Sequence, residues 1–137
     1  MSRLMRSFLV FAACCFAGAF VVQTFFPEVG GQGTAWGLAP GWQREIGFWN
    51  VFALAVVVGA LMRGDGDTPR IVALGIVALA FLLGTNHLVA VVGRRDGWAH
   101  YTPLFVNYLG VAWGTLALWS GRTTRAIREA PDRRMGP

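Results

Sequence analysis

Four apolar runs, each about as long as a lipid bilayer is thick, constrain the fold of this chain more than any other feature. A helix needs roughly 20 predominantly apolar residues to cross a hydrocarbon core of about 30 Å. The runs span Phe8–Phe26, Trp42–Met62, Ile71–Val92 and Thr102–Ser120. Charged residues make up only 14% of the 137-residue chain, whereas a soluble domain carries about 25%. The sequence therefore predicts an integral membrane protein with four transmembrane helices.

The segments between the runs are short and rich in turn-forming residues. The connection from Pro27 to Gly41 is rich in glycine and is predicted to be a flexible loop, whereas Arg63–Pro69 and Gly93–Gly97 are tight polar turns. Short connections make consecutive helices antiparallel. We therefore expect an all-α, antiparallel four-helix transmembrane bundle over residues 1–121, followed by a basic cytoplasmic tail over residues 122–137.

The distribution of arginine predicts the orientation of the chain. All 12 basic residues are arginine, and only Arg44, Arg94 and Arg95 lie at the ends of the runs opposite the N-terminus. The other nine lie on the side of the N-terminus, and arginine-rich flanks stay in the cytoplasm. Both termini are thus expected to be cytoplasmic, in a multi-pass protein of the cytoplasmic (inner) membrane. The tryptophans expected at the membrane interfaces are Trp36, Trp42 and Trp98 outside and Trp119 inside.

Both ends of the chain leave two interpretations open. Arg3, Arg6 and the short apolar stretch up to Ala19 resemble a cleavable signal peptide, but the run continues to Phe26, as a retained helix would. The tail from Arg122 alternates arginine with acidic residues. It is either an amphipathic extension on anionic lipid or a solvated tail.

The net charge of +5 does not indicate a nucleic-acid-binding protein. The arginines flank apolar runs, and no helix-turn-helix, zinc-finger or RNA-binding signature is present. Cys14 and Cys15 are adjacent, and neighbours on a helix point about 100° apart, so we expect no disulfide between them. The expected partners are the lipid bilayer and either a second copy or a larger membrane complex, and not nucleic acid.

Five polar side chains interrupt the apolar runs near their expected outer ends. Polar groups at membrane depth are costly and usually face the interior of a bundle or a water-filled cavity. Asn50, His87 and Asn107 each share a helical face with small residues, which mark close helix packing in membranes. We therefore expect a polar cavity in the outer half of the bundle that binds a small ligand, a proton or a cation. The candidate ligand-binding residues are Glu45, Asn50, Asn86, His87 and Asn107.

Each candidate also has a structural interpretation. Glu45 lies in the first turn of its helix, where an acid stabilises the helix dipole, or it forms the mouth of the cavity. Asn86 points about 100° away from His87 and faces another helix. His87 is either a ligand-binding residue or a hydrogen-bonded structural histidine, and asparagine side chains can simply join helices. Gln23 is a further candidate, whereas His100 is expected at the outer surface.

The sequence offers little support for a metal site or an enzyme. A zinc site usually takes four Cys, His or carboxylate ligands, and only Glu45 and His87 are candidates. A haem would need an axial histidine, for which His87 is available. No nucleophile–base pair occurs in the runs, and the glycine-rich connection lacks the Gly-Lys-Ser/Thr ending of a phosphate-binding loop. The sequence therefore does not favour a catalytic site, and it identifies no cofactor.

A structural or accessory subunit is the alternative function. Gly110 and Gly114 form a Gly-x-x-x-Gly pair, a motif through which membrane helices associate. In this alternative the Gly-x-x-x-Gly pair and the aromatic faces are exposed and dock a second copy or a larger complex. On the second run, Gly47 and Asn50 share a face, as do Ala55 and Gly59, and these small-residue faces are predicted to point into the bundle.

Three strings of the sequence resemble a known group of membrane proteins. They are Trp36–Asn50, Gly84–His87 and Pro103–Asn107. In these strings the chain resembles uncharacterised bacterial four-helix integral membrane proteins and, more loosely, the DoxX-like group. The resemblance implies the four-helix fold and no particular activity. The group's pattern has an acidic residue near the histidine of the third span, where this chain has Thr85 and Asn86.

Overall fold

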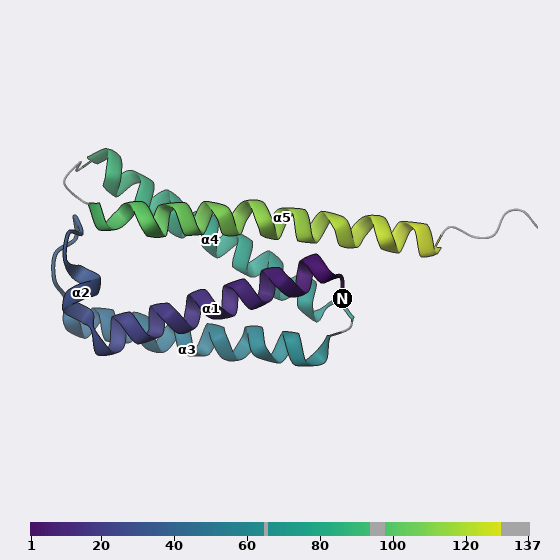
Figure 1. Ribbon diagram of the computed structural model, residues 1–137, viewed down its shortest axis with the longest axis horizontal. Helices are drawn as coiled ribbons and strands as arrows, with labels where there is room; N and C mark the ends of the chain where they lie inside the picture. The colour runs from purple at the N-terminus through teal and green to yellow at the C-terminus, as the bar shows by residue number, and fades with distance from the viewer. Residues whose placement is uncertain (65, 94–97, 130–137) are drawn as a thin grey trace, which may run out of the picture.

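The computed structural model describes the backbone of residues 1–64, 66–93 and 98–129, and, within these ranges, the side chains up to residue 120. The elements are α1 (Arg3–Phe25), α2 (Pro27–Gly31), α3 (Pro40–Arg63), α4 (Thr68–Gly93), the 3₁₀ helix η1 (Trp98–His100) and α5 (Tyr101–Glu129). Figure 1 shows how the α-helices are arranged. No strand occurs in the described ranges, so the all-α prediction is confirmed.

Among the described helices, α1, α3 and α4 are long and apolar enough to cross a membrane. They contain 23, 24 and 26 residues, and a helix of 20 residues already spans about 30 Å. Large apolar side chains on their surfaces are exposed, such as Trp49 at 71% and Phe52 at 63%. Such surfaces suit lipid better than water. The prediction of a membrane protein is confirmed at the level of these three helices.

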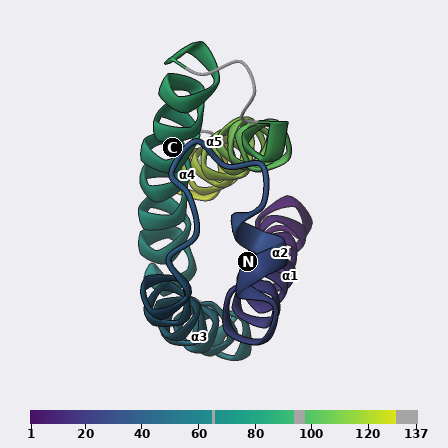
Figure 2. The same cartoon turned by 90° about the vertical axis from the view of Figure 1, so that its left-hand side faces the viewer.

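The long helices pack in two pairs. α1 packs along α3, and α4 packs along α5, while α5 also contacts α1. α4 is tilted relative to the other long helices and bridges the two pairs, as the two perpendicular views in Figures 1 and 2 show. The four longest helices therefore share one packed body.

The apolar core lies toward the end of the molecule that holds the N-terminus. Phe8 on α1 is completely buried there, and it lies against Gly114 of α5 together with Val77 of α4. A Cβ atom at Gly114 would overlap Val77 Cγ2, so the glycine allows α4 and α5 to approach. The buried core residues are Met5, Phe8, Leu9, Val57, Ala60, Ala73 and Ala117.

Small residues line the helix contacts on α4 and α5, as predicted. The buried alanines and glycines are Ala73, Ala80, Gly84 and Ala90 on α4, and Gly110, Gly114 and Ala117 on α5. The expectation that the Gly-x-x-x-Gly pair is exposed for docking is wrong, because Gly110 and Gly114 pack against α1 and α4 within the chain. This stripe is used in folding and is not available to a partner.

On α3 the predicted packing face is confirmed at Gly47, which is buried against α1, and is wrong for Ala55 and Gly59. Ala55 and Gly59 are exposed, and Val57 and Ala60 are buried in their place. The physical reason is that large and small apolar residues can both face hydrocarbon at little cost, so the spacing of small residues alone does not identify the packed face.

The glycine-rich connection predicted to be a loop contains a helix. α2 begins with Pro27 at its first position and has Glu28 in its first turn, and both residue types are favoured at the start of a helix. The remainder, residues 32–39, leaves α2 and reaches across to α4 and α5 before the chain enters α3, as the dark-blue connection in Figure 2 shows. We refer to this stretch as the 32–39 segment.

Candidate functional site

Two histidines from different elements meet beside the 32–39 segment. His87 lies on α4, and His100 is the last residue of η1. Their Nδ1 atoms are 2.9 Å apart. His100 has no exposed surface, and its Nε2 atom lies 2.8 Å from the backbone nitrogen of Ala35. One buried imidazole thus joins the end of α4 to the 32–39 segment.

The hydrogen bonds determine where the protons of this pair lie. The Ala35 N–H can only donate, so His100 Nε2 accepts and carries no proton. A neutral His100 then carries its proton on Nδ1, which donates to His87 Nδ1. His87 Nδ1 therefore accepts, and its own proton is on Nε2. Among the described residues, no partner accepts a hydrogen bond from His87 Nε2.

Burial and geometry both keep His100 neutral. Burial lowers the pKa of His100 below its ordinary value, because an imidazolium would lose its hydration. His100 also directly precedes α5, and the N-terminus of a helix disfavours a positive charge. A proton added at Nε2 would moreover face the Ala35 N–H, so two donors would meet.

Two tryptophans complete the contact between the 32–39 segment and η1. The Trp36 ring lies 4.4 Å from the His100 ring and 5.1 Å from the His87 ring, centroid to centroid. The Trp98 indole packs directly on Gly33, which has a φ of +70° and no room for a Cβ atom. The Ala99 N–H also donates to the Gly33 carbonyl, at 3.2 Å. This arrangement holds the segment against the start of α5.

Asn50 and Gln23 form a second polar contact, between α3 and α1. The Asn50 amide Nδ2 donates to Gln23 Oε1 and to the Ile46 carbonyl of its own helix, both at 2.9 Å. In the same pair of helices, Thr24 Oγ1 and Gln43 Oε1 are buried without a hydrogen-bond partner in the described structure. Thr24 lies against Gly47 of α3, whereas the Gln43 amide lies near Gly31 of α2.

Asn107 lies apart from both contacts. Its Nδ2 atom donates to the Pro103 carbonyl of α5 at 2.7 Å, and its side chain lines a cavity of about 60 Å³ between α1, α4 and α5. The other residues lining this cavity are apolar or weakly polar: Phe8, Phe11, Ala12, Cys15, Phe16, Ile76, Leu79, Ala80, Leu83, Val106 and Gly110. Asn107 is thus the main polar group of an apolar cavity.

The predicted polar residues do not form one hydrogen-bonded cluster in the described part of the chain. Asn50 pairs with Gln23, His87 pairs with His100, and Asn107 bonds to its own helix. Glu45 and Asn86 are exposed.

The sequence predicts His100 at the outer surface, and this prediction is wrong. His100 is fully buried. The physical reason is that residues 32–39 cover it, supplying both the Ala35 N–H and the Trp36 ring. The only signal in the sequence is a tryptophan in each of the two short segments that meet, Trp36 and Trp98.

The histidine pair is poorly arranged for a cation. A cation at the two Nδ1 atoms would move the His100 proton to Nε2, where it would face the Ala35 N–H. Within the described ranges, no group of three His, Cys, Asp or Glu side chains could hold a metal ion. The pair instead presents one N–H donor, at His87.

Comparison with known proteins adds no assignment. No family model, no curated protein and no solved structure matches this chain. The resemblance to DoxX-like proteins therefore stays a prediction.

Proposed function

We propose that the chain is a multi-pass protein of the cytoplasmic membrane with four antiparallel spans and both termini in the cytoplasm. Three apolar helices support membrane insertion. For α5, the support is its packing along α4 and the exposure of Phe105 and Trp119, both at 69%. Side chains of this kind are expected on a lipid-facing helix surface.

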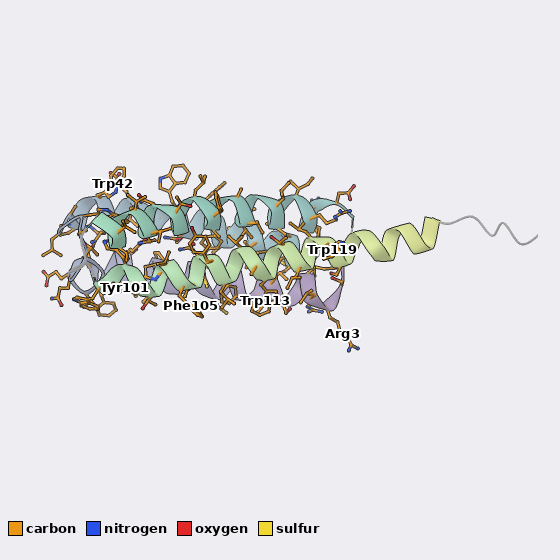
Figure 3. The ribbon with its side chains drawn as sticks, turned by 90° about the horizontal axis from the view of Figure 1, so that it is seen from above. Arg3, Trp42, Tyr101, Phe105, Trp113 and Trp119 are labelled. Carbon is orange, nitrogen blue, oxygen red and sulfur yellow. The ribbon has the colours of Figure 1, made fainter. Side chains whose placement is uncertain are left out.

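The placement of interfacial residues is consistent with this orientation. Figure 3 shows Trp42 and Tyr101 at one end of the molecule, and Arg3 and Trp119 toward the other. Aromatic residues favour both membrane interfaces, and arginine favours the cytoplasmic one.

Labelling with a membrane-impermeant thiol reagent would test the orientation. In a background with Cys14→Ser and Cys15→Ser, a cysteine replacing Gly37 should react in intact cells, and one replacing Ser2 should react only after lysis. The opposite pattern would refute the orientation.

We further propose that the His87–His100 pair binds a small ligand through an oxygen acceptor, such as a carboxylate, phosphate or carbonyl oxygen. The observation that carries this proposal is the order of hydrogen bonds from Ala35 through His100 to His87. These hydrogen bonds hold the His87 ring in place and leave its Nε2–H group as a hydrogen-bond donor. Trp36 is 55% exposed and provides an aromatic wall beside it.

This site differs from the cavity expected from the sequence. A fixed N–H donor favours an acceptor over a cation, and the partner group of His87 is His100 rather than Asn50 or Asn107. The proposed ligand-binding residues are therefore His87 directly, with His100 and Trp36 positioning it.

Native mass spectrometry of the protein extracted in mild detergent would test the ligand proposal. The wild type should carry a bound small molecule. His87→Asn should lose it, because Asn Oδ1 can replace Nδ1 as the acceptor for His100 but supplies no donor at the position of Nε2. Asn86→Ala, at the exposed neighbouring position, is the matched control and should keep it.

The same experiment can contradict the proposal in two ways. A wild type without any bound small molecule, or a His87→Asn variant that binds it equally well, would exclude the site. A stoichiometric protein partner in place of a small molecule would favour the accessory-subunit alternative.

A further inference from the structure

The attachment of the 32–39 segment depends on one neutral side chain. Of the two hydrogen bonds between the segment and η1, one joins backbone groups of Ala99 and Gly33, and the other ends on His100 Nε2. Gly33 and Gly37 have φ values of +70° and +76°, so left-handed glycines stand on both sides of Ala35. Glycine tolerates large changes of φ and ψ, and these two positions can act as hinges.

The histidine pair has no free place for a further proton. His100 Nε2 accepts from Ala35, His100 Nδ1 donates to His87, and His87 Nδ1 accepts. A proton that binds His100 Nε2 removes the acceptor of the Ala35 N–H and leaves two donors facing each other. Protonation of His100 is therefore coupled to loss of the bond that holds the segment.

Among the described residues at this end of the elements packed against His100, none is a carboxylate that would stabilise its protonated form. The 32–39 segment contains no ionisable residue. η1 packs against α4 and α5, whose described ionisable residues at this end are His87, Tyr101 and Tyr108. None of these three side chains is a carboxylate that could pair with an imidazolium.

We propose that the 32–39 segment is a pH-sensitive cover over His87, attached while His100 is neutral and released when a proton from the adjacent aqueous phase binds His100 Nε2. The proton takes the lone pair that now accepts from Ala35, and no covalent bond between heavy atoms changes. Because Trp36 contacts both histidine rings, its departure with the segment uncovers His87. The mechanism concerns the attachment of the segment and stands whether or not His87 binds a ligand.

Amide hydrogen exchange at Ala35 measures the attachment directly. The full-length protein, labelled with ¹⁵N-alanine and held in detergent micelles, would be compared at about pH 7.5 and about pH 4.5, on either side of the ordinary histidine pKa. After correction for the intrinsic pH dependence of exchange, protection of the Ala35 amide should fall roughly tenfold at the lower pH, the size expected for loss of one hydrogen bond. The amide of Ala73, buried in the core on α4, should keep its protection.

Two variants separate titration from packing. In His100→Gln, the amide oxygen accepts from Ala35 and does not titrate, so protection of the Ala35 amide should be present at both pH values. In His100→Phe, a ring of similar size offers no acceptor, so protection should be low at both. The Ala73 amide reports in each case whether the variant is folded.

Three results would overturn the proposal. Protection of the Ala35 amide in the wild type could be the same at both pH values. Protection of Ala73 could be lost together with that of Ala35, which would indicate general unfolding. A folded His100→Gln variant could lose protection on acidification as the wild type does. The wild-type measurement decides the question even where a variant does not fold.

Discussion

Gly114 provides a stringent test of how α1, α4 and α5 pack. A Cβ atom at this position would overlap Val77 Cγ2 and lie 2.7 and 2.9 Å from two ring atoms of Phe8. Neither neighbour can move easily, because Val77 is branched at Cβ and Phe8 is completely buried. Gly114→Ala should therefore strain the junction of all three helices.

The expected magnitude follows from two opposing effects. Inserting a methyl group into a well-packed core costs about 1–3 kcal/mol, while replacing glycine by alanine inside a helix contributes about 0.5–1 kcal/mol of stability. The difference between the middle values of these two ranges predicts that Gly114→Ala reduces the free energy of unfolding by roughly 1 kcal/mol.

Gly110 is the matched control, one turn earlier on the same helix. Its added Cβ atom would lie 3.8 Å from Ala80 Cβ and from a ring atom of Phe11, an ordinary van der Waals contact. No steric cost opposes the higher helix propensity of alanine at this position. Gly110→Ala should therefore raise the free energy of unfolding by about 0.5–1 kcal/mol. The two identical substitutions are thus expected to have opposite signs.

Unfolding in mixed micelles with increasing dodecyl sulfate, followed by circular dichroism, would measure both variants against the wild type. Transitions shifted in opposite directions would support the packing of Phe8 and Val77 against Gly114. If Gly114→Ala is as stable as Gly110→Ala, the junction does not have the close contacts described above, and the reasoning fails.

Three further predictions concern the polar contacts. Asn50→Leu and Gln23→Leu should each destabilise the packing of α1 on α3. A double-mutant cycle should give a coupling free energy of about 0.6 kcal/mol between the two side chains, the average for hydrogen bonds within membranes. A coupling free energy of zero would show that the Asn50–Gln23 hydrogen bond does not contribute to stability. Gly33→Ala should lower the free energy of unfolding by about 1–2 kcal/mol, because the φ of +70° suits glycine and the added Cβ atom would overlap the Trp98 indole. Denaturant titration measures this loss, and an unchanged free energy of unfolding would contradict the contact between Gly33 and Trp98. The folded state lowers the pKa of His100 below its ordinary value of 6.5, so the unfolded chain binds the proton first on acidification. The contribution of His100 to stability is therefore fully present above about pH 6.5 and is lost as the pH falls toward the folded pKa, and this part of the pH dependence should vanish in His100→Gln.

The positions of the long helices can be predicted from the lengths of the apolar runs. The contacts made by the segments that connect the helices cannot be predicted in this way. Runs of apolar residues locate α1, α3 and α4 to within a few residues, because helix length is fixed by the bilayer. Gly110 and Gly114 are recognisable as packing residues from the sequence, because close approach of helices needs small side chains. By contrast, His100 is buried by the 32–39 segment, and no periodicity links two short segments so far apart in the sequence.

The same limit explains why the polar residues were predicted as one cluster. The depth of a residue in the membrane and the helix face on which it lies can be predicted from its position in one helix. The hydrogen-bond partner of a polar side chain depends instead on which polar group lies nearest to it in the folded protein. In hydrocarbon the nearest acceptor is often the carbonyl one turn earlier on the same helix. The side chains of Asn50, Thr85, Asn107 and Thr115 all bond to the carbonyl four residues before them. A buried asparagine or threonine can thus be satisfied without any site, whereas an imidazole whose two ring nitrogens bond to separate elements cannot be explained by its own helix. That distinction directs the search for function to His100 and His87 rather than to the asparagines.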